Sequence, residues 1–231
     1  MSRNCAIILA AGKGRRMGQS INKQYLHIEG YPILYYTLRA FTQCNCIDEI
    51  IIVAAESEVE YCREEIVEKY NFIKVKDVVI GGKERQHSVL NGLKALRNCD
   101  IVLIHDGARP FINESIIENA VIYAELYGAT ACGVIPKDTI KMKDSCGFSM
   151  KAPSREMFFC VQTPQAFKYE LILDCHERIN NDGIMVTDDT MVVEKYGNRV
   201  YLYEGSYNNI KVTTPEDLDI GQQILKKISI I

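Results

Sequence analysis

Short apolar runs alternate with amphipathic segments along this chain. The runs are rich in Ile and Val, as in strands buried on both faces, and they cover residues 6–9, 49–55, 74–80, 101–104 and 130–135. The segments between them carry helix signals, at residues 32–43, 57–70, 85–96 and after Asn113. This alternation predicts one α/β domain over residues 1–231, with a mostly parallel sheet between two layers of helices. Ser57 and Asn113 are expected to cap two of these helices.

The pattern changes between residues 137 and 155. Residues 138–143 and 148–151 show the alternating side-chain pattern of strands, and a turn at 144–147 separates them. This pattern predicts a hairpin that is too polar to bury itself. We expect residues 137–155 to form a β-arm that packs on a second copy of the protein. The alternative is a flap over the chain's own site. Helices near 168–179 and 188–196, a strand at 199–203 and a helix after Pro215 complete the expected elements.

A basic, glycine-rich loop follows the first apolar run. It reads LAAGKGRRMG over residues 9–18, and no acidic residue precedes Glu29. The loop contains three cations, Lys13, Arg15 and Arg16, and Lys23 follows it five residues later. Such a loop suits a polyanion such as a nucleoside triphosphate, although a solvated surface turn is an alternative. Gly81–Gly82 and Asp106 also follow predicted strands, so they should lie at the same edge of the sheet.

These residue types suit phosphoryl or nucleotidyl transfer, which needs cations and Mg²⁺ around the reacting phosphorus. Arg16 and Lys23 are the leading candidates. Asp106 ends an apolar strand, where its carboxylate could hold Mg²⁺ or could simply stabilise the turn. Arg109 could bind phosphate or pair with Asp106. Ser88 could contact a base or could be buried at the start of a helix.

Composition limits the classes of partner. A net charge of −3 and a pI near 5.9 argue against a general nucleic-acid binder. The apolar runs are too short for a signal peptide or a membrane span, so we expect a cytoplasmic protein without a membrane partner. The nine cysteines include no Cys-x-x-Cys pair, which favours reduced, mostly buried thiols over a zinc site. This chain does not have the full dinucleotide-binding fingerprint of nicotinamide enzymes, because the third glycine is missing after Gly14.

The ordered motifs resemble the 2-C-methyl-D-erythritol 4-phosphate cytidylyltransferase family of the non-mevalonate isoprenoid pathway. They comprise the first loop, GGKERQHSV at 81–89, HDGARP at 105–110, DTIK at 138–141, QTPQAF at 162–167, TDD at 187–189 and NIKVTTPEDL at 209–218. The resemblance implies a single Rossmann-like, three-layer nucleotidyltransferase domain. It also implies a Mg²⁺-dependent homodimer, joined through the arm, that transfers CMP from CTP to a polyol phosphate and releases pyrophosphate.

The resemblance also implies roles for individual residues. The catalytic residues would be Arg16, Lys23, Arg155 and Lys211. Nucleotide binding would involve Ala10, Ala11, Gly12, Gly14, Gly82, Ser88 and Asp106, with Asp106 also the metal ligand. The polyol phosphate would be bound by Arg109, Thr139, Arg155, Thr163, Thr187 and Lys211, with Thr139 and Arg155 reaching across to the partner's substrate. Lys83 departs from a well-known relative, which has Asp at this position.

Two other functions remain open at this point. The ribitol-5-phosphate cytidylyltransferases form a sister family with similar motifs, although residues 9–12, 88–89 and 106–109 look closer to the methylerythritol family. A nucleotide-binding regulator without catalysis is the second alternative. Such a regulator would have no need of Arg16, Lys23 and Asp106 together.

Overall fold

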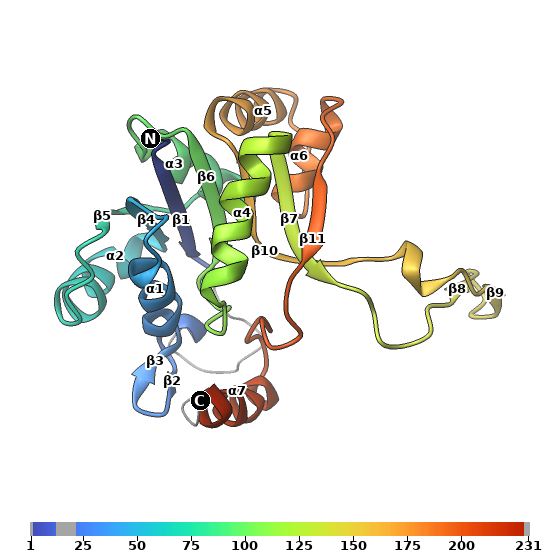
Figure 1. The fold of residues 1–231 in the computed structure, drawn as a ribbon, viewed down its shortest axis with the longest axis horizontal. Helices are drawn as coiled ribbons and strands as arrows, with labels where there is room; N and C mark the ends of the chain where they lie inside the picture. Colours follow the sequence, from blue (N-terminus) through green and yellow to red (C-terminus); the bar gives the residue numbers. More distant parts are fainter. Residues whose placement is uncertain (1, 13–21, 229–231) are drawn as a thin grey trace.

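One seven-stranded sheet forms the centre of the protein (Figure 1). The computed structural model describes residues 2–12 and 22–228. The strand order is β11-β7-β10-β6-β1-β4-β5. The strands are β1 (Asn4–Ala10), β4 (Glu49–Ala54), β5 (Val75–Ile80), β6 (Ile101–Asp106), β7 (Ala129–Val134), β10 (Cys160–Lys168) and β11 (Tyr201–Glu204). All neighbours pair in parallel except β10, which is antiparallel to β6 and β7, so the predicted mostly parallel sheet is confirmed.

β10 is the strand that the hydrophobic pattern did not predict. Three of its residues, Gln162, Thr163 and Gln165, are polar and nevertheless buried. Their side chains are hydrogen-bonded, for example from Gln162 Nε2 to the carbonyl oxygen of Ser206 at 2.8 Å. Pro164 lies where the register with β7 shifts, and it has no N–H to donate. The strand therefore lacks an apolar run because its side chains serve a polar network.

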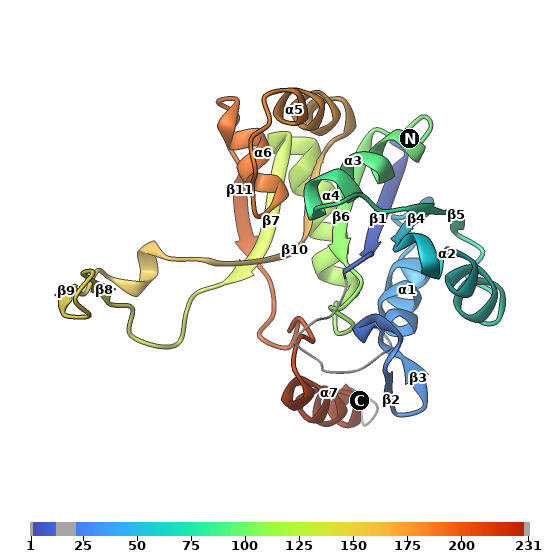
Figure 2. The same ribbon diagram turned by 180° about the vertical axis from the view of Figure 1, so that it is seen from behind.

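Helices cover both faces of the sheet, as predicted (Figures 1 and 2). The helices α1 (Ile33–Gln43) and α4 (Glu114–Tyr127) lie on one face, and α3 (Arg85–Ala95), α5 (Tyr169–Asn181) and α6 (Asp189–Lys195) lie on the other. Alternate residues of β1 supply the two cores, because successive side chains of a strand point to opposite faces. Ala6 and Ile8 pack with α1 and α4, whereas Cys5 and Ile7 pack with α3 and α5.

The two predicted helix caps have different outcomes. Asn113 caps α4, since its side chain accepts a hydrogen bond from the Ile116 amide at 3.0 Å. Ser57 does not cap a helix, because it lies inside the short 3₁₀ helix η3 (Glu56–Glu58). The predicted helix over 57–70 continues as α2 (Val59–Tyr61) and the π-helix η4 (Cys62–Glu68). Glu58 accepts hydrogen bonds from Asn22 and Gln24, and this tertiary contact fixes the irregular start.

A small third core lies beyond the carboxyl ends of the strands. It joins β2 (His27–Ile28) and the start of α1 to the C-terminal helix α7 (Pro215–Ile228), which the sequence predicted. Phe111 and Val212 pack between these elements. β2 pairs with the short strand β3 (Tyr31–Pro32). Figure 2 shows α7 next to this edge of the sheet. No helix in residues 2–12 and 22–228 is both long and apolar enough to cross a bilayer.

Residues 135–159 project away from the sheet as an arm (Figures 1 and 2). It contains β8 (Met142–Lys143), β9 (Ser149–Lys151) and the 3₁₀ helix η5 (Arg155–Met157), so its hairpin is shorter than predicted. Asp144 Oδ1 accepts hydrogen bonds from the amides of Cys146 and Phe148, both at 2.9 Å, and Gly147 supplies a positive φ of 93°. Phe148 and Met157 are 73% and 80% exposed. Contact of this arm with a second copy stays a prediction.

The nine cysteines are all free thiols, and six of them are buried. This confirms the expectation of unpaired, mostly buried cysteines.

Candidate active site

A cavity of about 590 Å³ opens at the carboxyl ends of β1, β5 and β6. The sequence-predicted residues in its wall are Ala11, Gly12, Lys23, Gly82, Ser88, Asp106 and Lys211. They come from segments far apart in the chain, and the parallel sheet brings them together as predicted. Ala10 lies just behind the wall at the end of β1, where it is 2% exposed. Gly14 and Arg16 lie outside the residues that the structure describes.

A turn of two glycines lies at one side of the cavity, with Gly82 in the wall. A Cβ at Gly81 would lie 2.5 Å from Ala11 Cβ, and a Cβ at Gly82 would overlap His87. The absence of a side chain therefore lets Gly81 pack closely on Ala11 and lets Gly82 pack closely on the start of α3. The Gly82 amide donates to Ser88 Oγ at 3.0 Å, and Ser88 Oγ donates to the Glu84 carbonyl at 3.2 Å. Ser88 thus holds the shape of this wall from the start of α3.

Lys23 is placed by its neighbour in the 3₁₀ helix η2 (Lys23–Tyr25). Gln24 is 2% exposed, and its amide donates to the carbonyl oxygen of Ala10 at the end of β1. This hydrogen bond ties η2 to the first strand. As a result, Lys23 lies in the cavity wall beside the chain segment that leaves β1.

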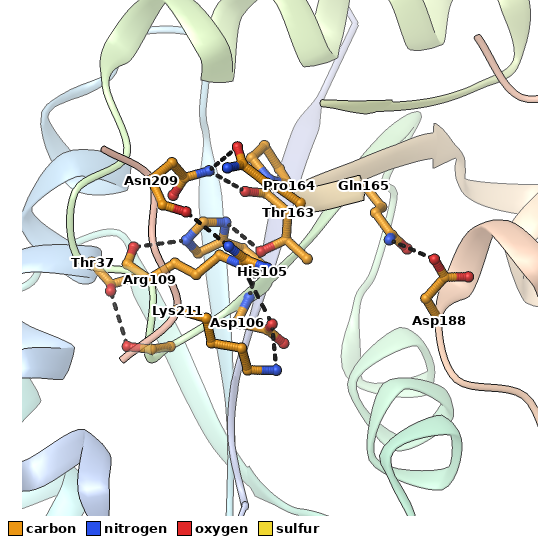
Figure 3. Close-up of polar contacts among 12 residues, drawn as sticks. Thr37, His105, Asp106, Arg109, Thr163, Pro164, Gln165, Asp188, Asn209 and Lys211 are labelled. Carbon is orange, nitrogen blue, oxygen red and sulfur yellow. Dashed lines mark hydrogen bonds and ion pairs between the residues drawn. The ribbon is translucent and has the colours of Figure 1, made fainter. Parts of the chain in front are cut away.

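Three cations surround the carboxylate of Asp106 (Figure 3 shows two of them). Lys211 Nζ lies 2.8 Å from Oδ2, Arg109 Nε lies 3.6 Å from Oδ2, and Arg85 Nε lies 3.8 Å from Oδ1. Burial alone would raise the pKa of Asp106, but Lys211, Arg85 and Arg109 hold it well below its usual range. Asp106 is therefore a carboxylate at any pH at which the protein works.

A buried hydrogen-bond chain fixes the backbone at Asp106 (Figure 3). The Asp106 amide donates to Thr163 Oγ1 at 3.1 Å, and Thr163 Oγ1 lies 3.1 Å from His105 Nδ1. Asn209 Nδ2 donates to the Thr163 carbonyl at 2.9 Å. Arg109 donates from a guanidinium nitrogen to the Asn209 carbonyl at 2.8 Å. Thr163 and Arg109 thus hold Asp106 from behind and are not in the cavity wall, and their predicted substrate contacts stay predictions.

His105 is neutral in this chain. Its Nε2 lies 3.2 Å from the Arg109 carbonyl, so Nε2 carries the proton and Nδ1 accepts from Thr163. Complete burial lowers the pKa of His105 to about 4. A second proton would remove the acceptor that Thr163 uses.

Stability should fall on acidification through His105. The unfolded chain binds this proton near pH 6.5 and the folded chain only near pH 4, so protons favour unfolding between these values. The free energy of unfolding is expected to fall by about 2 kcal/mol between pH 7 and pH 5 through this group alone. Urea titrations of wild type and His105→Gln measure it, and the variant should lose less. Exposed His27→Gln is the control, and equal losses in all three proteins would contradict the prediction.

Thr139, Arg155 and Thr187 do not line the cavity of their own chain. Thr139 and Arg155 belong to the arm, where Arg155 donates to the Lys137 carbonyl at 3.0 Å. Thr187 is exposed before α6, and its hydroxyl lies 3.1 Å from the sulfur of Met191. Their roles in substrate binding therefore stay predictions.

Arg85 and Lys83 are cavity residues to which sequence reasoning gave no role. Arg85 is the first residue of α3, and its NH2 group lies 2.7 Å from Asp189 Oδ2. A signal for Arg85 was present, because it follows a glycine turn that itself follows a strand. Nothing in the sequence indicated that Asp189 would be its partner.

The donor set limits the kind of metal site that fits here. Among the described residues, no group of three or more His, Cys, Asp and Glu side chains is arranged to hold a metal ion. Asp106 is one carboxylate with cations on both oxygens. This donor set fits a Mg²⁺ ion that is held mainly by the phosphates of a bound nucleotide, with Asp106 as at most one protein ligand.

A mostly parallel sheet with a glycine-walled, cation-rich cavity at its carboxyl ends is typical of an α/β protein that binds a nucleotide. Comparison with known proteins gives the family. A family model described as 2-C-methyl-D-erythritol 4-phosphate cytidylyltransferase matches residues 4–227, and the chain belongs to this family.

Individual relatives agree along the whole chain. A protein of Clostridium kluyveri with the same description is 59% identical over 226 residues, 98% of each chain. One of Clostridium acetobutylicum is 60% identical over 227 residues, 98% of this chain and 99% of that protein. The crystal structure of 4-diphosphocytidyl-2C-methyl-D-erythritol synthase from Anaerococcus prevotii has a TM-score of 0.87 at 33% identity, covering 97% of this chain and 96% of that one.

Proposed function

We propose that this protein is a CTP-dependent nucleotidyltransferase that transfers CMP from CTP to 2-C-methyl-D-erythritol 4-phosphate. The products are 4-diphosphocytidyl-2-C-methyl-D-erythritol and pyrophosphate, and the reaction belongs to isoprenoid precursor synthesis. The observation that carries the proposal is the cavity. It gathers Lys23, Lys211 and the Gly82 turn around a fixed carboxylate in a chain that belongs to this family.

The reaction requires little covalent chemistry from the protein. A phosphate oxygen of the substrate attacks the α-phosphorus of CTP, the bond to the bridging oxygen breaks, and pyrophosphate leaves with the electron pair. Lys23, together with Arg16 of the same sequence motif, stabilises the charge that develops on the α-phosphate oxygens. Lys211, held at 2.8 Å from Asp106, positions the incoming phosphate.

A divalent cation, Mg²⁺ in our proposal, enters with the nucleotide. When bound, it neutralises charge on the phosphates. Asp106 would hold it from the protein side. The Asp106 backbone, which donates to Thr163 Oγ1 and accepts from the Arg109 amide, keeps that carboxylate in one place.

Pyrophosphate release from CTP with Mg²⁺ tests the proposal directly. Purified protein is offered 2-C-methyl-D-erythritol 4-phosphate, ribitol 5-phosphate or no acceptor. Turnover is expected with the methylerythritol substrate. Turnover with ribitol 5-phosphate alone would replace the proposed substrate, and CTP binding without any turnover would favour a regulator.

We also propose that residues 137–155 complete the site of a second copy in a cytoplasmic homodimer. Within one chain, the arm points away from the body (Figures 1 and 2). It carries Arg155 and the exposed side chains of Phe148 and Met150. An arm with apolar side chains of this size in water is typical of a segment that packs on another protein surface.

Mixing two inactive variants tests the shared site. Lys23→Ala removes a cation from a chain's own cavity, whereas Arg155→Ala removes one from the partner's. A mixed dimer then has one site lacking both groups and one intact site. After equal mixing and subunit exchange, activity should recover to about a quarter of wild type, because about half of the dimers are mixed. No recovery in mixtures that do exchange subunits would place Arg155 in its own chain's site.

A further inference from the structure

A buried chain of charged and polar groups leads from α5 to the candidate active site. His176 Nε2 donates to Asp189 Oδ1 at 3.3 Å, and Asp189 Oδ2 lies 2.7 Å from the NH2 group of Arg85. Arg85 Nε in turn lies 3.8 Å from Asp106 Oδ1. The side chains of His176 and Asp189 are each only 1% exposed. This chain joins α5, α6 and α3 to the end of β6.

We propose that Asp189 is a positioning residue for nucleotide binding and that it acts through Arg85. Asp189 holds the guanidinium at the cavity wall in the orientation that meets the phosphates of a nucleoside triphosphate. This inference rests on the proposed function, since it assigns Arg85 to the same nucleotide.

Asp189 is itself held firmly enough for this role. Its amide donates to Gln165 Oε1 at 2.9 Å, which ties the start of α6 to β10. His176 occupies one carboxylate oxygen and Arg85 faces the other. Although burial opposes ionisation, Arg85 and His176 lower the pKa of Asp189, so the carboxylate is charged and pairs with the guanidinium.

Pairing with Asp189 reduces the entropy that the Arg85 side chain would lose on binding a ligand. A free arginine side chain has about 2 kcal/mol of rotamer entropy to lose on binding a ligand. Asp189 removes that freedom before the nucleotide arrives, and preorganisation of this kind raises affinity. At 2.7 Å it is also the closer of the two carboxylates, the other being Asp106 at 3.8 Å. It therefore keeps Arg85 from collapsing onto Asp106.

The charges around the cavity favour an anion. Two carboxylates, Asp106 and Asp189, face three cations, Arg85, Arg109 and Lys211. One positive charge is left over in this cluster. Lys23 and Lys83 in the wall add two positive charges and Glu84 in the wall removes one, so the cavity stays net positive. Arg85 is 28% exposed, so part of its guanidinium is open to a ligand.

A double-mutant cycle on CTP affinity tests the role. Isothermal titration with CTP and Mg²⁺ compares wild type, Asp189→Asn, Arg85→Ala and the double variant. Asp189→Asn is expected to raise the Kd for CTP about tenfold, and it should have no further effect once Arg85 is alanine. Asp189→Glu, which restores the charge, should recover most of the affinity. Equal effects of Asp189→Asn with and without Arg85 would overturn the proposal.

Asp174→Asn is the matched control. Asp174 is an exposed aspartate on α5 that pairs with Arg178 at 3.5 Å, so its variant should bind CTP like wild type. If Asp189→Asn does not fold, His176→Leu takes its place in the cycle. That variant removes the hydrogen bond to Asp189 and should weaken CTP binding only while Arg85 is present. If the wild type turns over CTP but the effects of the two substitutions on the Kd are additive, only this inference is refuted. If the wild type neither binds nor turns over CTP, the proposed function is refuted.

Discussion

Replacing Lys23 with alanine is expected to lower kcat by about 10²–10³-fold, with a rise of less than about tenfold in the Kd for CTP. Lys23 lies in the cavity wall on a segment that Gln24 ties to the end of β1. Its ammonium group therefore meets charge that develops at the α-phosphorus more strongly than charge already present in CTP. Single-turnover rates and titration calorimetry measure the two quantities separately.

Lys83→Ala is the matched control, because Lys83 lines the same cavity with the same charge. We expect it to change kcat by no more than about threefold, since Lys83 is exposed and a solvated charge acts mainly by long-range attraction that salt screens. If Lys23→Ala weakened CTP binding as much as turnover, Lys23 would be a binding residue. That outcome would revive the nucleotide-binding regulator.

Replacing Asp106 with asparagine is expected to reduce both turnover and stability. Three cations would lose their shared carboxylate, and removing one partner of a buried ion pair costs about 3–5 kcal/mol. Turnover should fall by about 10²-fold, because Lys211 would lose the group that orients it. Urea unfolding and the pyrophosphate assay measure the two effects.

The pH dependence of the Asp106 contribution has a definite sign. Since the folded pKa lies below the unfolded value, the stabilisation is present above about pH 4 and is lost as the pH falls further. Asp77→Asn is the control, because that carboxylate is 50% exposed where it pairs with Arg63 and should contribute less than about 1 kcal/mol. Equal stability of Asp106→Asn and wild type would show that the three cations do not depend on this carboxylate.

Local patterns predicted most of the fold for a physical reason. Strands buried on both faces need continuous apolar runs, such as residues 50–54 and 101–104, and these runs leave a clear signal. Asn113 was predictable because capping acts within a few residues. β10 was not, because Gln162 and Thr163 form hydrogen bonds to distant segments, which no local pattern records.

The site was predictable to a similar extent. Glycines and cations after predicted strands indicated Lys23, Gly82 and Asp106, because all parallel strands end at one edge of the sheet. The pairing of Arg85 with Asp189 joins two helix starts that are far apart in the sequence. Thr163 and Arg109 also hold the backbone at Asp106, a role that the sequence did not indicate, and their substrate contacts stay predictions.

The support of Asp106 also has a consequence for the order of folding. β6 can pair with β1 once the first 106 residues have been synthesised. Thr163 follows Asp106 by 57 residues, and Asn209 and Lys211 come later still. Since chains emerge from the ribosome N-terminus first, the parallel half of the sheet can assemble before these partners exist. Asp106 therefore gains its supporting contacts only after the strands that position it have been made, and a chain that ends before Thr163 lacks all three of these partners.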